Sequence, residues 1–356
     1  MGAKKIAVMA LRLNVCAAFV ALSVPVACAL AASAAQPSKG ADVFLAQPVP
    51  SPDLRQVHRV SLRKSRNVSP GRATSKSMHP SRRHSVAQVA GLRKTSDSLE
   101  LKSSAALVID QETNEILVSK NADAVLPIAS LTKLMTALVI AEAKIPLDEL
   151  LTVSQDDVDT EKGSRSRLKV GTQLTRNEML HLALMASENR AAHTLGRTFP
   201  GGSEAFVEAM NAKSKELGMS DTSFVESTGL SSRNRSSARD LATLVGAAHQ
   251  HPIIREMSVS PQAKVEVGRR NLLFHTTNRL VLRADWEIGL QKTGYISEAG
   301  RCLVMQATFS GRSLIMVFLD SAGKHSRLGD AERVRRWIML TLPTEPSALA
   351  DARLTS

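Results

Sequence analysis

Strand-like apolar segments occur at both ends of the chain's apolar body, and this placement constrains the fold more than any other feature. Residues 105–109 and 116–118 are two such segments, and the turn-rich stretch between them predicts a β-hairpin. Three more follow near the other end, at residues 286–292, 302–308 and 314–319. We therefore expect one sheet built from both ends of the body, with a helical region inserted between its halves.

Helical periodicity fills the sequence between these strand signals. Thr175 and Glu178 form a capping-box pattern, which predicts a helix that begins there and runs through Met185. Apolar residues at helical spacing predict further helices at residues 131–143, 191–197, 204–217, 238–249 and 329–340. Strands and helices are segregated along the chain, so the predicted fold class is α+β, with a central sheet and helices arranged as an α/β sandwich.

The first 35 residues have the three parts of a secretory signal. Lys4, Lys5 and Arg12 precede an apolar stretch at residues 13–30, and the small residues at 32–34 form an A-x-A-like cleavage site. We expect this segment to be cleaved and the protein to reach the periplasm. The alternative is an uncleaved membrane anchor.

Residues 36–100 form a second segment with its own composition. They contain twelve basic and four acidic residues and few large apolar ones. Such a segment buries too little apolar area to offset the entropy of ordering, so we predict a disordered linker. It would either bind an anionic wall polymer or membrane surface, or serve as a solvated spacer. The remaining 256 residues have a net charge of only +2, which argues against a nucleic-acid partner.

Cysteine usage and ligand spacing give no sign of a metal or organic cofactor. Cys302 is the only cysteine after the predicted signal peptide, and its apolar surroundings indicate a buried structural thiol. The sequence has no CxxC or HExxH pattern. We therefore expect the protein to work without metal or cofactor.

The first of three short motifs places a serine and a lysine on one helix face. Ser130 and Lys133 are three residues apart at the start of the predicted helix 131–143, so their side chains lie one turn apart. A serine hydroxyl becomes a good nucleophile when a base removes its proton, and a lysine is such a base when its ammonium form is disfavoured. The Ser130 N–H could also stabilise an oxyanion.

The second motif, Ser187-Glu188-Asn189, follows the helix that ends at Met185. The serine hydroxyl could relay a proton to a leaving amine, and the asparagine amide could bind both substrate and the lysine of the first motif. Taken alone this motif is weak, because a helix C-cap followed by an N-cap would look the same.

The third motif, Lys292-Thr293-Gly294, ends a strand-like segment. The lysine would supply a second cation near the first motif, and the threonine hydroxyl could bind a substrate carboxylate. The glycine would let a substrate backbone approach the strand. The N–H of Tyr295 could complete an oxyanion pair.

The order of these motifs resembles the SxxK, SxN and KTG series of penicillin-binding proteins and class A β-lactamases. The resemblance covers residues 101–345, leaves residues 346–356 as a tail, and is strongest to low-molecular-weight D-Ala-D-Ala peptidases. Glu188 stands where carboxypeptidases of this family usually have glycine, as in the endopeptidase branch. Too few residues follow the last predicted helix for the second domain and anchor of the carboxypeptidases.

The resemblance implies a central antiparallel sheet and a serine acyl-enzyme mechanism. Lys133 would activate Ser130, the nucleophile, and the substrates would be peptidoglycan stem peptides and cross-links, with β-lactams as covalent inhibitors. Ser187, Asn189 and Lys292 would complete the catalytic group, and Thr293, Gly294 and Tyr295 would bind substrate. Less securely, the resemblance also suggests that Arg327 binds the substrate carboxylate.

Three alternatives to a D,D-endopeptidase are open at this point. A D,D-carboxypeptidase uses the same chemistry with D-Ala as the leaving group. A β-lactamase of class A would need a Glu-x-x-x-Asn stretch between Asn189 and Lys292, and the sequence has none. A non-catalytic wall-binding protein would bind through its basic linker, but the intact motifs argue against it.

Overall fold

The computed structural model describes residues 84–341. The predicted signal peptide, residues 36–83 of the predicted linker and the tail at 346–356 lie outside the described residues. We therefore describe only the body of the chain, which forms one compact unit by itself.

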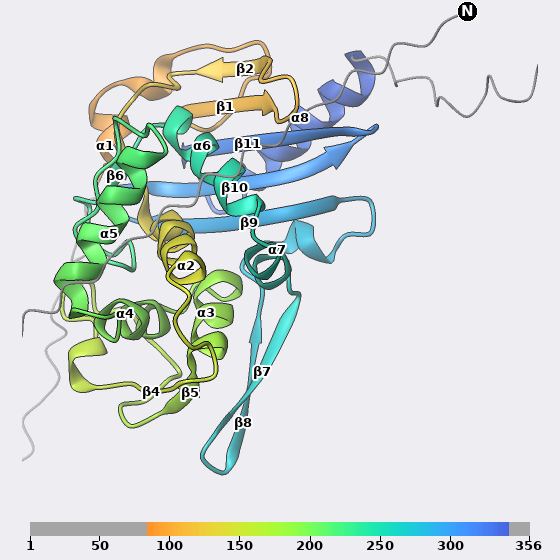
Figure 1. Ribbon diagram of the computed structural model, residues 1–356. Helices are drawn as coiled ribbons and strands as arrows, with labels where there is room; N and C mark the ends of the chain where they lie inside the picture. The colour runs from red at the N-terminus through yellow and green to blue at the C-terminus, as the bar shows by residue number, and fades with distance from the viewer. Residues whose placement is uncertain (1–83, 342–356) are drawn as a thin grey trace, which may run out of the picture. The chain divides into compact units, whose positions relative to one another are not determined.

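A five-stranded antiparallel sheet forms the centre of this body (Figure 1). The two ends of the chain interleave in it, because β1 pairs with β11 from Ala105–Leu319 to Asp110–Leu314. The strands, in spatial order, are β2 (Ile116–Lys120), β1 (Ala105–Asp110), β11 (Arg312–Ser321), β10 (Gly300–Phe309) and β9 (Glu287–Ile296). The predicted α+β class and the sheet built from both ends are confirmed.

The sheet is buried on both faces, because its side chains alternate between two apolar cores. Val317 and Leu319 of β11 belong to the core shared with most of the helices, whereas Met316 and Phe318 belong to the core under the last helix. Cys302 lies in the first core, where burial raises the pKa of its thiol to about 12. The structural thiol expected from the sequence is confirmed.

Helices cover both faces of the sheet. Helix α6 packs on β1, β10 and β11, and α8 packs on β10 and β11 from the other side (Figure 1). The α-helices are α1 (Val86–Val89), α2 (Thr132–Glu142), α3 (Arg176–Met185), α4 (Asn189–Arg197), α5 (Gly202–Glu216), α6 (Ala238–His249), α7 (Pro252–Ser258) and α8 (Ser326–Thr341). Four 3-10 turns accompany them: η1 (Leu92–Lys94), η2 (Ala129–Leu131), η3 (Gln155–Asp157) and η4 (Arg279–Leu282).

The predicted helix starts are mostly correct. The capping box is formed as expected, because the Glu178 N–H donates to Thr175 Oγ1 and the Thr175 N–H donates to Glu178 Oε2. The last helix begins at Ser326 rather than at residue 329. Among the described residues, none of the helices is long and apolar enough to cross a membrane.

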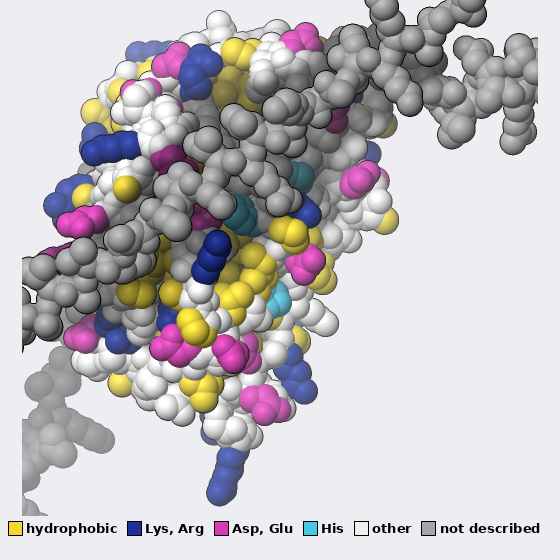
Figure 2. Space-filling view, in the orientation of Figure 1, with side chains coloured by type: hydrophobic (Ala, Val, Ile, Leu, Met, Phe, Trp, Pro, Cys, Tyr) yellow, Lys and Arg dark blue, Asp and Glu magenta, His cyan; other side chains and the backbone are white. Residues whose placement is uncertain are grey.

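Three small antiparallel pairs lie outside the central sheet. The largest is the hairpin of β7 (Gln262–Val267) and β8 (Arg270–His275), which projects away from the body (Figure 1). The others pair β3 (Leu126–Pro127) with β6 (Arg235–Ser236) and β4 (Leu150–Thr152) with β5 (Gln173–Thr175). On the face seen in Figure 2, basic and acidic side chains are interspersed, as the small net charge of the body implies.

The predicted disordered linker ends earlier than expected, because residues 84–100 pack against the sheet. Ala87 of α1 is 1% exposed, and the Val86 N–H donates to the Glu298 carbonyl in the β9–β10 turn at 2.9 Å. Arg93 forms a bidentate ion pair with Asp320 of β11. Contacts with residues more than 200 positions away thus order a segment whose own composition is polar.

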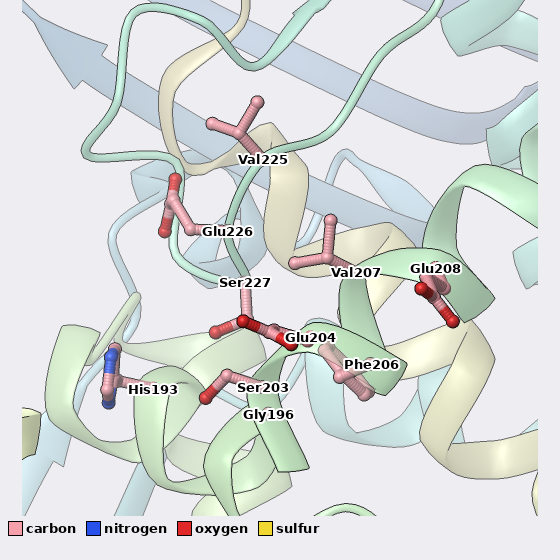
Figure 3. Close-up of a pocket in the computed structure, with 10 residues that line it drawn as sticks. All are labelled: His193, Gly196, Ser203, Glu204, Phe206, Val207, Glu208, Val225, Glu226 and Ser227. Carbon is pink, nitrogen blue, oxygen red and sulfur yellow. The ribbon is translucent and has the colours of Figure 1, made fainter. Parts of the chain in front are cut away.

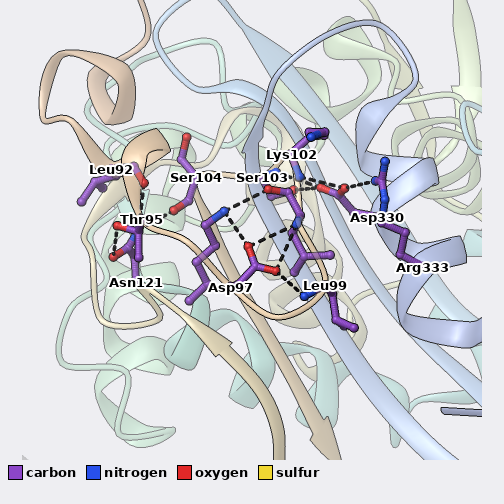
Figure 4. Close-up of polar contacts among 12 residues, drawn as sticks. Leu92, Thr95, Asp97, Leu99, Lys102, Ser103, Ser104, Asn121, Asp330 and Arg333 are labelled. Atoms are coloured by element: carbon purple, nitrogen blue, oxygen red, sulfur yellow. Dashed lines mark hydrogen bonds and ion pairs between the residues drawn. The ribbon is translucent and has the colours of Figure 1, made fainter. Parts of the chain in front are cut away.

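Two carboxylates fix the end of this segment and the residues that connect it to β1 (Figure 4). Asp97 accepts hydrogen bonds from the Leu99 and Leu101 N–H groups and forms an ion pair with Lys120. Asp330 of α8 is fully buried and accepts from the N–H of Lys102 and from both the N–H and Oγ of Ser103. The entry to β1 is therefore tied to the last helix.

Candidate active site

Ser130 lies in the short turn η2, directly before α2, where two glycine positions allow other backbone segments to come close. A Cβ at Gly229 would overlap the Ala129 carbonyl oxygen, and one at Gly294 would lie 3.1 Å from the Ser130 nitrogen. Gly229 also has a φ of +83°, which favours glycine. The serine is thereby held between strand β9 and the turn at Gly229.

Lys133 lies on the first turn of α2, with a side chain fully excluded from solvent. Its Nζ is 3.1 Å from Ser130 Oγ, 2.7 Å from Asn189 Oδ1 and 2.6 Å from the Thr228 carbonyl oxygen. Asn189 Oδ1 and the Thr228 carbonyl oxygen can only accept hydrogen bonds from the lysine nitrogen. A neutral amine would donate its two hydrogens to them and turn its lone pair toward the serine hydroxyl. The arrangement suits a base that deprotonates Ser130.

The environment of Lys133 favours this neutral form. Burial lowers the pKa of the lysine to about 8, although the carboxylates of Glu226 and Glu188 partly oppose the shift. A minor fraction of the lysine, about a tenth, is therefore neutral at pH 7.

Lys292 on β9 is the second buried lysine of the site, and its Nζ donates to the Thr293 carbonyl at 2.8 Å. Burial, with the positive charges of Lys133 and Arg327, holds the pKa of Lys292 well below its usual value. The two lysine side chains therefore lie close enough for the charge of Lys133 to disfavour the ammonium form of Lys292.

The second motif occupies the turn between α3 and α4. Ser187 has a left-handed backbone, with φ at +58°, and Asn189 is the first residue of α4. Besides accepting from Lys133, the asparagine amide donates from Nδ2 to Ser164 Oγ at 3.0 Å. This second bond fixes the orientation in which Oδ1 faces the lysine.

The third motif lines the edge strand β9. Thr293 Oγ1 lies 2.7 Å from Thr277 Oγ1, and Arg327 of α8 donates to the Gly294 carbonyl at 2.9 Å. Tyr295 is 55% exposed. The structure thus brings Ser130, Lys133 and Asn189 into direct contact. Gly294 of the third motif lies against the Ser130 backbone, and Arg327 is bonded to the Gly294 carbonyl.

Sequence reasoning missed the segment that completes this site from the α5–β6 connection. The Thr228 carbonyl accepts from Lys133, and Glu226 accepts from the N–H groups of Thr228 and Gly229 and from Asn234 Nδ2. Glu226 thereby shapes the turn that holds Lys133. Within this segment, Gly229 was the one residue whose type hinted at a special backbone, because a carbonyl such as that of Thr228 can come from any residue type.

Two hollows border this group of residues. One of 200 Å³ is lined by Asn189 and Thr228 together with residues of the 156–161 segment. The other, of 340 Å³, lies between α4, α5 and the 225–227 segment; Figure 3 shows Phe206 and Val207 on α5, with His193 and Glu226 at other points of its wall. The second hollow contains none of the nine predicted site residues.

Comparison with known proteins agrees with this geometry. Residues 92–323 match the S11 peptidase family model, described as D-alanyl-D-alanine carboxypeptidase. A D-alanyl-D-alanine endopeptidase from Pseudomonas aeruginosa is 47% identical over 71% of this chain and 82% of its own length. One from Escherichia coli is 43% identical over 72% and 84%.

Solved structures show the same fold. The Streptomyces K15 DD-transpeptidase has a TM-score of 0.63 at 25% identity, over 68% of this chain and 98% of that chain. Penicillin-binding protein D2 from Listeria monocytogenes, in its cefotaxime-bound form, has a TM-score of 0.61 at 30% identity over the same shares. The sequence match, the fold and the assembled motifs agree, and this chain therefore belongs to the S11 family of serine D-alanyl-D-alanine peptidases.

Proposed function

We propose that this protein is a serine D,D-endopeptidase that hydrolyses D-Ala–diaminopimelate cross-links of peptidoglycan through an acyl-enzyme on Ser130. The observation that carries the proposal is the buried amine of Lys133, held 3.1 Å from Ser130 Oγ by two further acceptors. The relatives at 47% and 43% identity, both named as endopeptidases, support this choice of substrate.

The acylation step follows from this geometry. Lys133, as a neutral amine, takes the proton of Ser130, whose Oγ attacks the carbonyl carbon of the D-Ala residue. The carbonyl oxygen becomes an oxyanion, for which we assign the N–H groups of Ser130 and Tyr295 as donors. Preorganised donors of this kind stabilise developing charge without reorganisation.

Collapse of the intermediate expels the leaving amine, which needs a proton. We assign its delivery to Ser187 and Lys292, with the proton originating from the Lys133 ammonium. Asn189 and Thr293 position the substrate, Gly294 allows close approach, and Arg327 holds the carboxylate beside the leaving nitrogen. Water activated by Lys133 then attacks the ester, which releases the D-Ala carboxylate and restores Ser130.

A D,D-carboxypeptidase is the second candidate function. The catalytic residues would be the same, and relatives named as carboxypeptidases match at 32% and 30% identity. The difference lies in the leaving group, which is D-Ala in one case and the diaminopimelate of a neighbouring stem in the other.

The proposed setting follows from the same substrate. We place the enzyme in the periplasm, exported by the segment at 1–35, and expect β-lactams to acylate Ser130. The basic segment at 36–83 would bind an anionic wall or membrane surface, or act as a spacer.

Digestion of purified muropeptides tests the proposal. The protein should convert a D-Ala–diaminopimelate-linked dimer to two monomers, and the Ser130→Ala variant should leave the dimer intact. Mass spectrometry distinguishes this reaction from loss of one terminal D-Ala. Release of D-Ala from pentapeptides with an intact dimer would favour the carboxypeptidase.

A further inference from the structure

A large polar hollow opens beside Tyr295, next to the third motif. Its volume is 720 Å³. One side is formed by the end of β9 and the start of β10, and another by the loop that leads into α8. The remaining wall comes from residues 84–93, the segment that sequence analysis had placed in a disordered linker.

The hollow adjoins the part of the site where a leaving group would lie. Tyr295, whose N–H we assign to oxyanion stabilisation, directly follows the third motif. Lys324, in the loop before α8, is three residues from Arg327, which donates to the Gly294 carbonyl. In both D-Ala and diaminopimelate the carboxylate is attached to the carbon that bears the leaving nitrogen. A leaving group whose carboxylate is bound at Arg327 would have this hollow within reach, because Tyr295 and Lys324 line it.

Two cations on this surface are available for a ligand. The Arg301 guanidinium lies 4.6 Å from the centre of the Tyr295 ring, which holds it in place. Within residues 84–341, the structure pairs neither Arg301 nor Lys324 with a carboxylate, whereas Arg93 in the same hollow is paired with Asp320. The lining thus presents unneutralised positive charge.

The wall made by residues 84–93 is firmly attached. Ser85 is 4% exposed, the Val86 N–H donates to the Glu298 carbonyl, and Ala87 is buried in the core. The Arg93–Asp320 pair fixes its other end. The hollow is therefore a preformed feature of the fold.

We propose that this hollow is the leaving-group subsite of the endopeptidase and that it binds an anionic stem peptide through Arg301 and Lys324. This inference rests on the proposed function and specifies how the cross-link is recognised. A carboxypeptidase would need room for D-Ala alone. The leaving group of a cross-link is a peptide of several residues, which carries carboxylates on diaminopimelate and on its terminal D-Ala.

The test compares the double variant Arg301→Gln/Lys324→Gln with a matched control, Lys215→Gln/Arg270→Gln, which removes two exposed charges from α5 and β8. The substrates are a cross-linked dimer and the same dimer with the carboxylates of its acceptor stem amidated. We expect kcat/KM for the unmodified dimer to fall about tenfold in the double variant, the scale of two exposed ion pairs, with no change in the control.

Reactions with the amidated dimer and with benzylpenicillin show whether the double variant loses recognition of substrate charge or has a damaged active site. The double variant should cut the amidated dimer as well as the wild type does and should be acylated by penicillin at the wild-type rate. An unchanged kcat/KM for the unmodified dimer would overturn the proposal, and so would an equal loss with both dimers.

Calorimetric measurement of the affinity for the free tetrapeptide stem tests the subsite without relying on turnover. The wild type should bind it about tenfold more tightly than the double variant does. Equal binding, or none at millimolar peptide, would overturn the subsite. A wild type that binds the peptide and reacts with penicillin, yet leaves every dimer intact, would instead overturn the endopeptidase function.

Discussion

The protonation state of Lys133 should control the rate at which Ser130 is acylated. Burial lowers the pKa of this lysine to about 8, and only the neutral amine can accept the serine proton. Two carboxylates face it, Glu188 from the α3–α4 turn and Glu226 from the α5–β6 connection. Lys292 of β9 also lies within electrostatic reach of Lys133, and Arg327 acts on Lys292.

The size of the effect follows from the titration curve. With a pKa of about 8, roughly 9% of the molecules have a neutral lysine at pH 7, about half at pH 8 and about 91% at pH 9. The second-order rate constant for acylation by benzylpenicillin should therefore rise about tenfold between pH 7 and pH 9 and then level off. The slope of log rate against pH should be close to one below the midpoint.

Removing one of the carboxylates near the lysine shifts this profile in a defined direction. The negative charge of Glu188 raises the pKa of Lys133, so Glu188→Gln should move the midpoint to lower pH and speed acylation at pH 7, with the plateau unchanged. Glu112→Gln, in the exposed β1–β2 turn, is the control.

Stopped-flow or quenched mass-spectrometric measurement of acylation from pH 6 to pH 10, with circular dichroism to confirm folding, provides the assay. A rate that stays flat across this range would refute the role of Lys133 as the base. A Glu188→Gln midpoint displaced to higher pH would refute the electrostatic reasoning.

Three further perturbations test the packing and the organisation of the chain. Gly229→Ala should lower the rate of acylation at least tenfold and destabilise the fold by about 1–3 kcal/mol, because the added Cβ would overlap a backbone oxygen. Gly218→Ala, at a similar φ but in open space, should leave the rate of acylation unchanged. Asp330→Ala should lower the free energy of unfolding in urea by about 3 kcal/mol, since the donors of Lys102, Ser103, Ser321 and Arg333 lose a buried acceptor. The exposed Asp123→Ala should change it by less than about 1 kcal/mol, and equal effects would contradict the anchoring role. Deleting residues 36–83 should leave hydrolysis of soluble substrates intact and weaken retention on sacculi at low salt, and unchanged retention would favour the spacer.

The sequence predicted the central sheet because its signals are local. The hairpin of β1 and β2 joins neighbouring segments, and β10 and β11 are apolar runs that are buried almost throughout and are separated by a short turn. The β7–β8 hairpin was missed although Ala263 and Val265 alternate with polar residues, which is the pattern of a half-buried strand. Residues 84–100 were misjudged because the contacts that order them, such as Arg93 with Asp320 and the Val86 N–H with the Glu298 carbonyl, come from residues near the other end of the described body.

In the candidate site, too, local motifs were predicted and residues that act through the backbone or through distant contacts were missed. The three motifs were readable because each places chemistry-bearing residues within a few positions of one another, and the structure brings Ser130, Lys133 and Asn189 together. Thr228 contributes only a backbone carbonyl, which any residue type could supply. Glu226 acts by shaping a turn, and no local pattern distinguishes it from a surface glutamate.

The most direct test of the central claim, an acyl-enzyme on Ser130, is the intact mass of the protein after reaction with benzylpenicillin. The wild type should form a stable adduct equal to the mass of the drug, and Ser130→Ala should form none. No adduct in the wild type, or an adduct that persists in Ser130→Ala, would contradict it.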